Sequence, residues 1–109
     1  MRGLQDIQQC VATCLECGAT CEETARSLVA SDGERALVNA LISCAAVSRL
    51  VADYLESGAE LTVPTIDFFA DVCRETGEAC ERVDDPQLGR CAQQCFECES
   101  CAREALAAD

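Results

Sequence analysis

The sequence carries two series of cysteines, one near each end of the chain. The first series steps by four, three and four residues, and the second by four, three and three. Residues three, four and seven positions apart share one face of an α-helix, so each series predicts a column of thiols along a helix. At about 1.5 Å of rise per residue, the first column is roughly 16 Å long. The two series are Cys10, Cys14, Cys17 and Cys21, and Cys91, Cys95, Cys98 and Cys101.

Thiolates are soft ligands, which select Cu(I), Zn(II) and iron–sulfur clusters over magnesium, calcium or manganese. The chain has 11 cysteines, no histidine and one methionine, which is Met1. Without an imidazole, a Cys–His nucleophilic pair cannot form within the chain. We therefore predict a metal-binding protein that is not an enzyme. The predicted ligands are all eleven cysteines, namely the eight of the two series together with Cys44, Cys73 and Cys80.

The identity of the metal stays open at the level of composition. Structural zinc needs four ligands that converge on one tetrahedral point, usually from knuckles and loops. Cu(I) accepts two or three thiolates, so several ions can share bridging sulfurs along a helix. A [4Fe-4S] cluster needs four cysteines around one point, which would leave seven unused. Three interpretations stay open at this point: storage of several Cu(I) ions per chain, an iron–sulfur electron carrier whose cluster has four cysteine ligands, and a zinc or redox buffer.

A buried cysteine can also pack simply as a small hydrophobic residue. This interpretation stays open for Cys44, Cys73 and Cys80 when each is considered singly. Eleven cysteines on inward-facing stripes argue against it for the set as a whole. Cys101 lies about 80° from Cys91 around a straight helix, so it is expected to face a neighbouring stripe rather than the axis.

Positioning these columns requires long helices. Ala, Leu, Glu and Arg are common, whereas glycine and proline are sparse, which favours helix. Each predicted helix has one apolar or cysteine stripe and an acidic outer face, and the connections are short. These features predict an all-α protein, an up-down-up-down antiparallel four-helix bundle with a cysteine-lined core. The predicted domain is a single one, residues 1–109, with helices at about 4–30, 33–57, 65–83 and 86–107.

Local signals mark the ends of these helices. Ser31 and Glu34 form an expected capping box for the second helix, and Gly58 is its expected C-cap. Thr65 is expected to cap the third helix. Asp85 is expected to cap the fourth, which then begins at a proline.

Counting residues from the turns places the thiols in layers. The first and fourth helices are neighbours in such a bundle, so their two columns face each other. The expected layers, starting at the end with the turn between the third and fourth helices, are Cys21 with Cys80 and Cys91, then Cys17 with Cys44 and Cys95, then Cys14 with Cys73 and Cys98, and last Cys10 with Cys101.

The charge of the chain limits its partners. The net charge is −12, which should repel nucleic acid and acidic membranes. No run of about 18 uniformly apolar residues is evident, so no membrane-spanning segment is predicted. The first residues lead into the cysteine helix without an apolar signal region, so we expect a cytoplasmic protein with reduced thiols.

The cysteine pattern resembles the cysteine-rich four-helix-bundle copper storage proteins, in their cytosolic branch. The resemblance rests on Cys10-x3-Cys14-x2-Cys17-x3-Cys21, on Cys91-x3-Cys95-x2-Cys98 and on isolated helical cysteines between them. It implies a bundle that stores or buffers Cu(I) on core cysteinates, and a homo-oligomer, often a tetramer. The chain departs from the family pattern because it has fewer cysteines and no histidine at the mouth of the bundle. These departures indicate a divergent member and leave the route by which the metal enters undefined.

Overall fold

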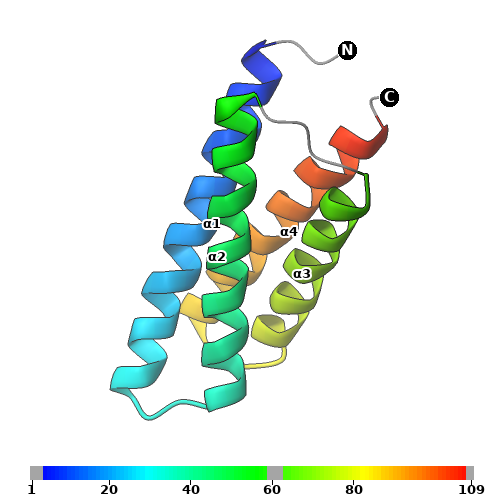
Figure 1. The fold of residues 1–109 in the computed structure, drawn as a ribbon. Coiled ribbons are helices and arrows are strands. Elements are labelled where there is room, and N and C mark those ends of the chain that lie inside the picture. Colours follow the sequence, from blue (N-terminus) through cyan, green and yellow to red (C-terminus); the bar gives the residue numbers. More distant parts are fainter. Residues whose placement is uncertain (1–3, 59–62, 108–109) are drawn as a thin grey trace.

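The protein is described by a computed structural model, which covers the backbone of residues 4–58 and 63–107 and the side chains of residues 8–58 and 63–105. The described chain forms four helices and contains no strand (Figure 1). They are α1 (Leu4–Ala30), α2 (Arg35–Ser57), α3 (Val63–Glu81) and α4 (Pro86–Ala107). The predicted all-α four-helix fold is therefore confirmed.

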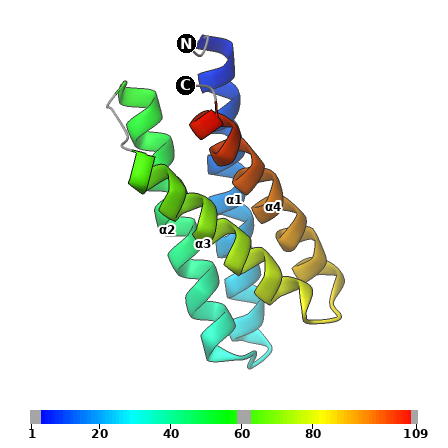
Figure 2. The same cartoon turned by 90° about the vertical axis from the view of Figure 1, so that its right-hand side faces the viewer.

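The helices run alternately in opposite directions along a common long axis. Both chain ends lie at one end of the bundle, and the α1–α2 and α3–α4 turns lie at the other (Figures 1 and 2). Each helix packs on two others, and α1 and α4 are neighbours. The two cysteine-rich helices thus face the same core, as predicted.

The end of α1 differs from the predicted capping box. Asp32 adopts a left-handed backbone with φ of 62°, and the Gly33 N–H donates to the Leu28 carbonyl at 2.6 Å. This hydrogen bond closes α1 with a Schellman-type turn. The Ser31 hydroxyl also donates to Leu28, and Glu34 precedes α2 without a side-chain capping bond. The capping-box prediction was wrong because the Ser31 hydroxyl bonds to the last turn of α1 and not to the first turn of α2.

Two other predicted caps are confirmed. Gly58 has a φ of 76°, and its N–H donates to the Leu55 carbonyl at the end of α2. The Asp85 carboxylate accepts from the backbone N–H groups of Gln87 and Leu88 at 2.8 and 3.1 Å. This side chain therefore satisfies two of the backbone donors that an α-helix leaves unpaired at its start.

The third helix begins earlier than predicted. It starts at Val63, so Thr65 lies inside the helix and the prediction that it caps α3 was wrong. A proline at Pro64 is compatible with this start because a first-turn residue needs no N–H donor. The residue before Val63 lies outside the described part of the chain. At its other end α3 stops at Glu81, before the predicted end at residue 83. Val83 is 40% exposed and does not belong to the buried face of the helix.

Helix α2 also corrects an expectation about membranes. By length and composition alone it is apolar enough to cross a bilayer. Its Leu41 and Ala52 are fully buried against the other helices. A core helix can pass the same test, so this property by itself does not assign α2 to a membrane.

Candidate metal centre

All eleven cysteines lie in the described part of the chain, and no disulfide joins any of them. Ten are buried and Cys101 is half-buried. Eight of these ten have no accessible surface. They lie on the inward-facing stripes of all four helices. The fully enclosed thiols are Cys17, Cys21, Cys44, Cys73, Cys80, Cys91, Cys95 and Cys98.

Four of these sulfurs form a compact group between three helices. Cys17 and Cys21 come from α1, Cys44 from α2 and Cys95 from α4, and all four Sγ atoms lie within 4.8 Å of one another. A metal held about 2.3 Å from each sulfur separates its ligands by roughly 3.8 Å when tetrahedral and 4.6 Å when linear. This four-sulfur group therefore has the size of a thiolate site for a single ion.

A second group shares one sulfur with the first. Cys17, Cys73 of α3 and Cys98 of α4 have their Sγ atoms within 4.8 Å of one another. This three-sulfur group fits a trigonal ion, a geometry that Cu(I) accepts and structural zinc does not favour. Because Cys17 belongs to both groups, ions bound in them could share its sulfur as a bridge.

Neighbouring thiols extend the two groups into one continuous chain of sulfurs. The Sγ atom of Cys21 lies 3.8 Å from that of Cys91, and Cys98 lies 4.0 Å from Cys14. Cys80 contacts Cys91 at the end near the turns. We call these nine residues the thiol column; they are Cys14, Cys17, Cys21, Cys44, Cys73, Cys80, Cys91, Cys95 and Cys98.

The predicted layers are close to this arrangement. Cys17, Cys44 and Cys95 lie together as expected, and so do Cys21 and Cys91. Two sulfurs differ from the prediction, because Cys21 also joins the layer of Cys17, and Cys17 also joins Cys73 and Cys98 of the next layer. Successive helical thiols differ by only one turn in height, so a single sulfur can serve two layers.

The thiols strongly perturb one another's acidity. S–H groups of Cys21 and then Cys44 can donate to the Cys17 sulfur, which lowers the pKa of Cys17. Donation to Cys17 raises the pKa of Cys95 in turn, and donation to Cys14 raises that of Cys98. A thiolate in this core is thus stabilised by hydrogen bonds from neighbouring thiols, and those neighbours must stay protonated to donate them.

The same coupling shifts the pKa values of the other core thiols. The contact with Cys17 raises the pKa of Cys44, but donors that include Cys21 and Cys73 outweigh it and lower this pKa to about 5. The pKa of Cys73 is raised by its contact with Cys17, and that of Cys80 by its contact with Cys91. Metal binding requires thiolates, so filling the column must release most of these protons.

The sequence interpretation missed three buried hydroxyl residues on the cysteine-bearing helices, Thr24, Ser48 and Thr76. Ser48 is fully buried in α2, and its hydroxyl oxygen has no hydrogen-bond partner among the described residues. Thr24 is 2% exposed, and its hydroxyl donates to a backbone carbonyl one turn earlier in α1 at 2.7 Å. The S–H group of Cys21 is the main donor that lowers the pKa of nearby Cys91. The position of Ser48 could have been found from register, since it follows Cys44 by four residues.

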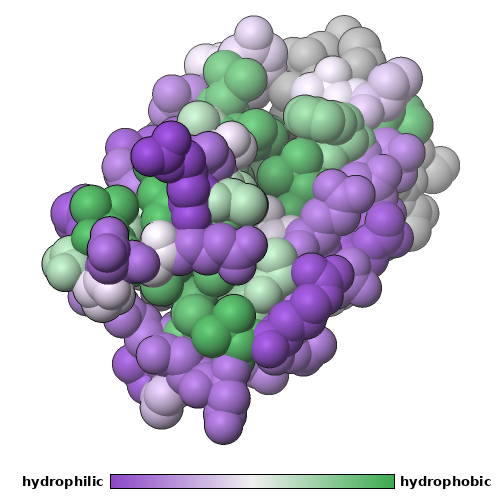
Figure 3. All heavy atoms as spheres, turned by 90° about the horizontal axis from the view of Figure 1, so that it is seen from below, coloured by the Kyte–Doolittle hydropathy of each residue, from purple (hydrophilic) through white to green (hydrophobic). Residues whose placement is uncertain are grey.

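The two ends of the column differ in how they are covered. Beyond the last thiols at the turn end, Ala25, Leu37 and Leu88 are buried in the core. Figure 3 views this end and shows hydrophobic side chains between the hydrophilic ones. At the other end, Cys10 and Cys101 line an open hollow of about 300 Å³ between α1 and α4.

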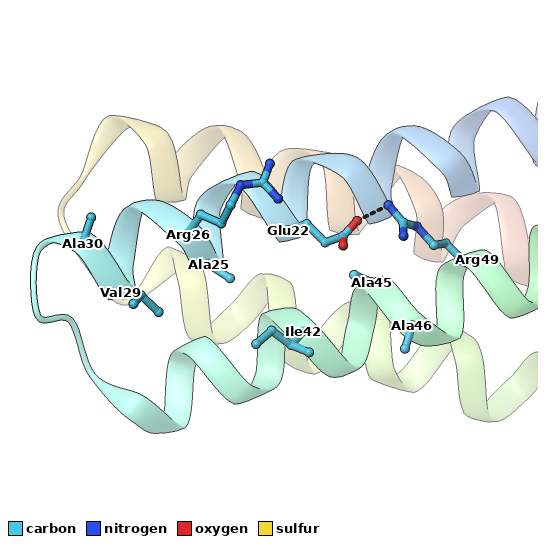
Figure 4. Close-up of a pocket in the computed structure, with 9 residues that line it drawn as sticks. All are labelled: Glu22, Ala25, Arg26, Val29, Ala30, Ile42, Ala45, Ala46 and Arg49. Atoms are coloured by element: carbon cyan, nitrogen blue, oxygen red, sulfur yellow. Dashed lines mark hydrogen bonds and ion pairs between the residues drawn. The ribbon is translucent and has the colours of Figure 1, made fainter.

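A larger hollow lies away from the sulfurs. It is an open groove of about 690 Å³ between α1 and α2, lined mostly by apolar side chains such as Val29 and Ile42 (Figure 4). An ion pair between Glu22 and Arg49 crosses it. No cysteine is among its described lining residues, so this groove is separate from the thiol column.

Comparison with known proteins gives a family and a fold. The family model described as copper storage protein matches residues 3–107. A crystal structure of the Nmul_A1745 protein from Nitrosospira multiformis superposes with a TM-score of 0.85, at 23% sequence identity, over 96% of this chain and 98% of that one. At this identity the structure establishes a shared fold. No curated protein matches the chain.

Proposed function

Because the chain belongs to the copper storage protein family, we propose that it stores or buffers Cu(I), with several ions per chain held by the thiol column. The observation that carries the proposal is the pair of sulfur groups that share Cys17. Storage needs more ligands than one site uses, and the column provides them. The function is binding, with copper as the cargo and no catalytic step.

The ligand chemistry supports Cu(I) over harder ions. Every side-chain ligand in the column is a thiol, and soft thiolates select Cu(I) and Zn(II). The three-sulfur group suits a low-coordinate ion, and Cu(I) is stable with two or three thiolates. Bridging through Cys17 would let neighbouring ions share ligands, which raises the number of ions that eleven cysteines can hold.

Titration of the reduced apoprotein with Cu(I) under anaerobic conditions tests the proposal. We expect several ions to bind tightly per chain, measured by copper analysis after desalting and by near-ultraviolet absorption of the Cu(I)–thiolate bonds. Saturation at one ion or none would contradict storage of several ions.

Zinc is a second candidate, because the four-sulfur group has the spacing of a tetrahedral thiolate site. A zinc protein should bind one ion in this group and should resist replacement by Cu(I). Competition between the two metals, followed by elemental analysis, separates the candidates. Retention of a single zinc ion in excess Cu(I) would favour the zinc buffer.

An iron–sulfur electron carrier remains the other alternative. Four sulfurs within 4.8 Å of one another leave room for a single ion at their centre, so a four-iron cluster would require the helices to move apart. An anaerobic preparation should be brown if such a cluster is present and colourless if copper is bound. A brown, iron-containing protein would contradict copper storage.

We also propose a cytoplasmic homo-oligomer, a tetramer by analogy with the family. Eleven thiols without a disulfide suit a reducing compartment. Exposed apolar side chains on several helices, including Ile42, Leu50 and Phe68, are available for contacts between copies. Cell fractionation tests the location, and light scattering tests the assembly, for which the mass of one chain, 11.6 kDa, would be the contradicting result.

A further inference from the structure

The hollow between α1 and α4, which we call the port, connects solvent with two thiols. Its described lining consists of polar or charged side chains and the sulfurs of Cys10 and Cys101. Cys10 is 6% exposed and Cys101 is half-buried, whereas eight other cysteines have no accessible surface. A volume of about 300 Å³ lies at the lower end of the range for small-molecule sites. The lining residues are Gln9, Cys10, Thr13, Glu97, Ser100, Cys101 and Glu104.

The two port cysteines continue the helical spacing of the thiol column. Cys10 lies one helical turn before Cys14 on α1, and Cys101 lies three residues after Cys98 on α4. Residues at these spacings are neighbours on a helix surface. Cys14 and Cys98 are themselves 4.0 Å apart, and Cys98 belongs to the three-sulfur group. Cys10 and Cys101 therefore lie one helical turn or less from the end of the column, as a stepwise transfer of an ion between cysteines requires.

The charge around the port is negative. Glu97 and Glu104 line it, and none of its described lining residues is basic. Arg103, although close in sequence, is held by Glu99 at 2.9 Å and by Asp71 of α3 at 3.1 Å. Two exposed carboxylates attract a cation and repel an anionic carrier.

We propose that the port is the site where Cu(I) is exchanged, and that it accepts Cu(I) from the thiolate complex of a small neutral or cationic thiol. This inference rests on the proposed storage function. The Cys101 sulfur binds the copper of the complex as the copper–sulfur bond to the carrier breaks. The proton of the Cys101 thiol goes to the departing carrier thiolate, which leaves as a neutral thiol. Copper stays Cu(I), and each later transfer toward Cys14 returns one proton to the sulfur that it leaves.

Loading kinetics test the role of Cys101. The full reduced chain is mixed with the Cu(I) complex of cysteamine, which is achiral, so near-ultraviolet circular dichroism reports only protein-bound copper. For Cys101→Ser we expect the initial rate to fall by about tenfold or more, because the remaining route requires local opening of the bundle. The matched variant Cys80→Ser also loses one thiol, at the opposite end, and should lower the plateau instead. Equal initial rates for these two variants would overturn the proposal.

Alkylation of the native apoprotein provides a readout that needs no copper. Iodoacetamide should label Cys101 first and Cys10 next, as located by peptide mapping. Earlier labelling of Cys80 or Cys91 would place the opening at the other end and overturn the port. Because alkylation uses the native protein, it also tests the proposal if the Cys101→Ser variant fails to fold. A wild-type chain that takes up no Cu(I) would instead contradict the storage function, whichever thiol is labelled first.

Carrier charge tests the acidic rim. The wild-type chain should load faster from the cationic cysteamine complex than from the anionic 3-mercaptopropionate complex. Glu97→Gln with Glu104→Gln should reduce this rate ratio by several fold. The control variant, Glu78→Gln with Glu81→Gln, removes the same charge from exposed sites on α3. It should change the rate ratio only slightly. An equal change in both double variants would show that net charge alone sets the preference and would overturn carrier selection at the port.

Discussion

The helices that line the core form two unlike walls. α1 and α4 together carry eight of the eleven cysteines, whereas α2 and α3 carry three. The largest fully enclosed apolar side chains, Leu41 and Phe69, lie on α2 and α3. We refer to the α1–α4 pair as the sulfur-rich wall and to the α2–α3 pair as the sulfur-poor wall. The difference indicates a division of labour, in which one wall supplies most of the ligands and the other most of the aliphatic and aromatic packing.

The contact between the walls has a specific shape. Gly77 on α3 faces the ring of Phe96 on α4, and a Cβ atom at Gly77 would lie 2.6 Å from the Cε1 atom of that ring. A glycine at this inward position thus makes room for an aromatic side chain of the other wall. The space taken by Phe96 explains why α3 carries no thiol there.

The largest expected effect is the response of the buried thiols to pH, to which the sulfur-rich wall contributes three of five thiols and the sulfur-poor wall two. The raised pKa of five thiols means that the folded apoprotein keeps protons that the unfolded chain loses above its thiol pKa, about 9.0. The contribution of these five thiols is therefore fully present below that pH and falls as the pH rises above it, by on the order of 1 kcal/mol per thiol and about 5–7 kcal/mol for the five at pH 10. The thiols are Cys21, Cys73, Cys80, Cys95 and Cys98.

Urea unfolding of the reduced apoprotein at pH 9 and pH 10 measures this loss. The lowered pKa values of Cys17, Cys44 and Cys91 act in the opposite sense, because they add stability as the pH rises to about 9 and add little more above it. The copper-loaded protein serves as the control. Its thiolates hold no protons, so its stability should rise up to about pH 9 and then level off. An apoprotein that is equally stable at pH 9 and pH 10 would contradict the raised pKa of these five thiols.

The next effect concerns the sulfur shared by both metal groups. Each site that is saturated at 100 times its Kd adds about 2.7 kcal/mol to stability. Cys17→Ser disrupts both groups and should remove about 5 kcal/mol of copper-linked stability, whereas Cys44→Ser disrupts only the four-sulfur group and should remove about half as much. The measurement is the difference in unfolding free energy between loaded and apo forms. Equal losses for the two variants would show that Cys17 is not shared.

A truncation on the sulfur-poor wall should affect packing instead. Phe69 is 1% exposed, so Phe69→Ala should destabilise the apoprotein by about 3–5 kcal/mol through lost burial and a new cavity. Its neighbour Phe68 is 59% exposed, and Phe68→Ala should change stability by no more than about 0.5 kcal/mol. Thermal unfolding of both variants tests the contrast. Similar losses would mean that Phe68 also contributes to packing, for example between copies.

The smallest expected effect tests the contact between the walls. Gly77→Ala should destabilise the protein by about 1–2 kcal/mol, since the clash with Phe96 exceeds the gain in helix propensity. Gly89 in α4 has no atom near its missing Cβ, so Gly89→Ala should stabilise the protein by up to about 1 kcal/mol. Adding Phe96→Ala to Gly77→Ala should restore part of the loss. A stabilising Gly77→Ala would refute the steric role of the glycine.

Much of the fold was predictable because its signals are local. The spacing of the cysteines and the Asp85 and Gly58 signals depend on nearby residues, and these predicted the helices and two of the caps. The Thr65 prediction was wrong because α3 begins two residues earlier, and the capping-box prediction was wrong because two elements compete for one side chain. Ser31 could serve either the end of α1 or the start of α2, and the backbone turn at Asp32 and Gly33 favoured α1.

The sequence by itself determined the chemistry of this protein: eleven soft ligands, no imidazole, and helical columns that must face a common core. Only the tertiary structure decided how the columns meet. It brought Cys17 into both sulfur groups, placed apolar residues over the turn end, and left Cys10 and Cys101 beside an open hollow. The reason is physical, because spacing along a chain fixes the face of a helix, whereas the distance between sulfurs on different helices depends on how the side chains of all four pack.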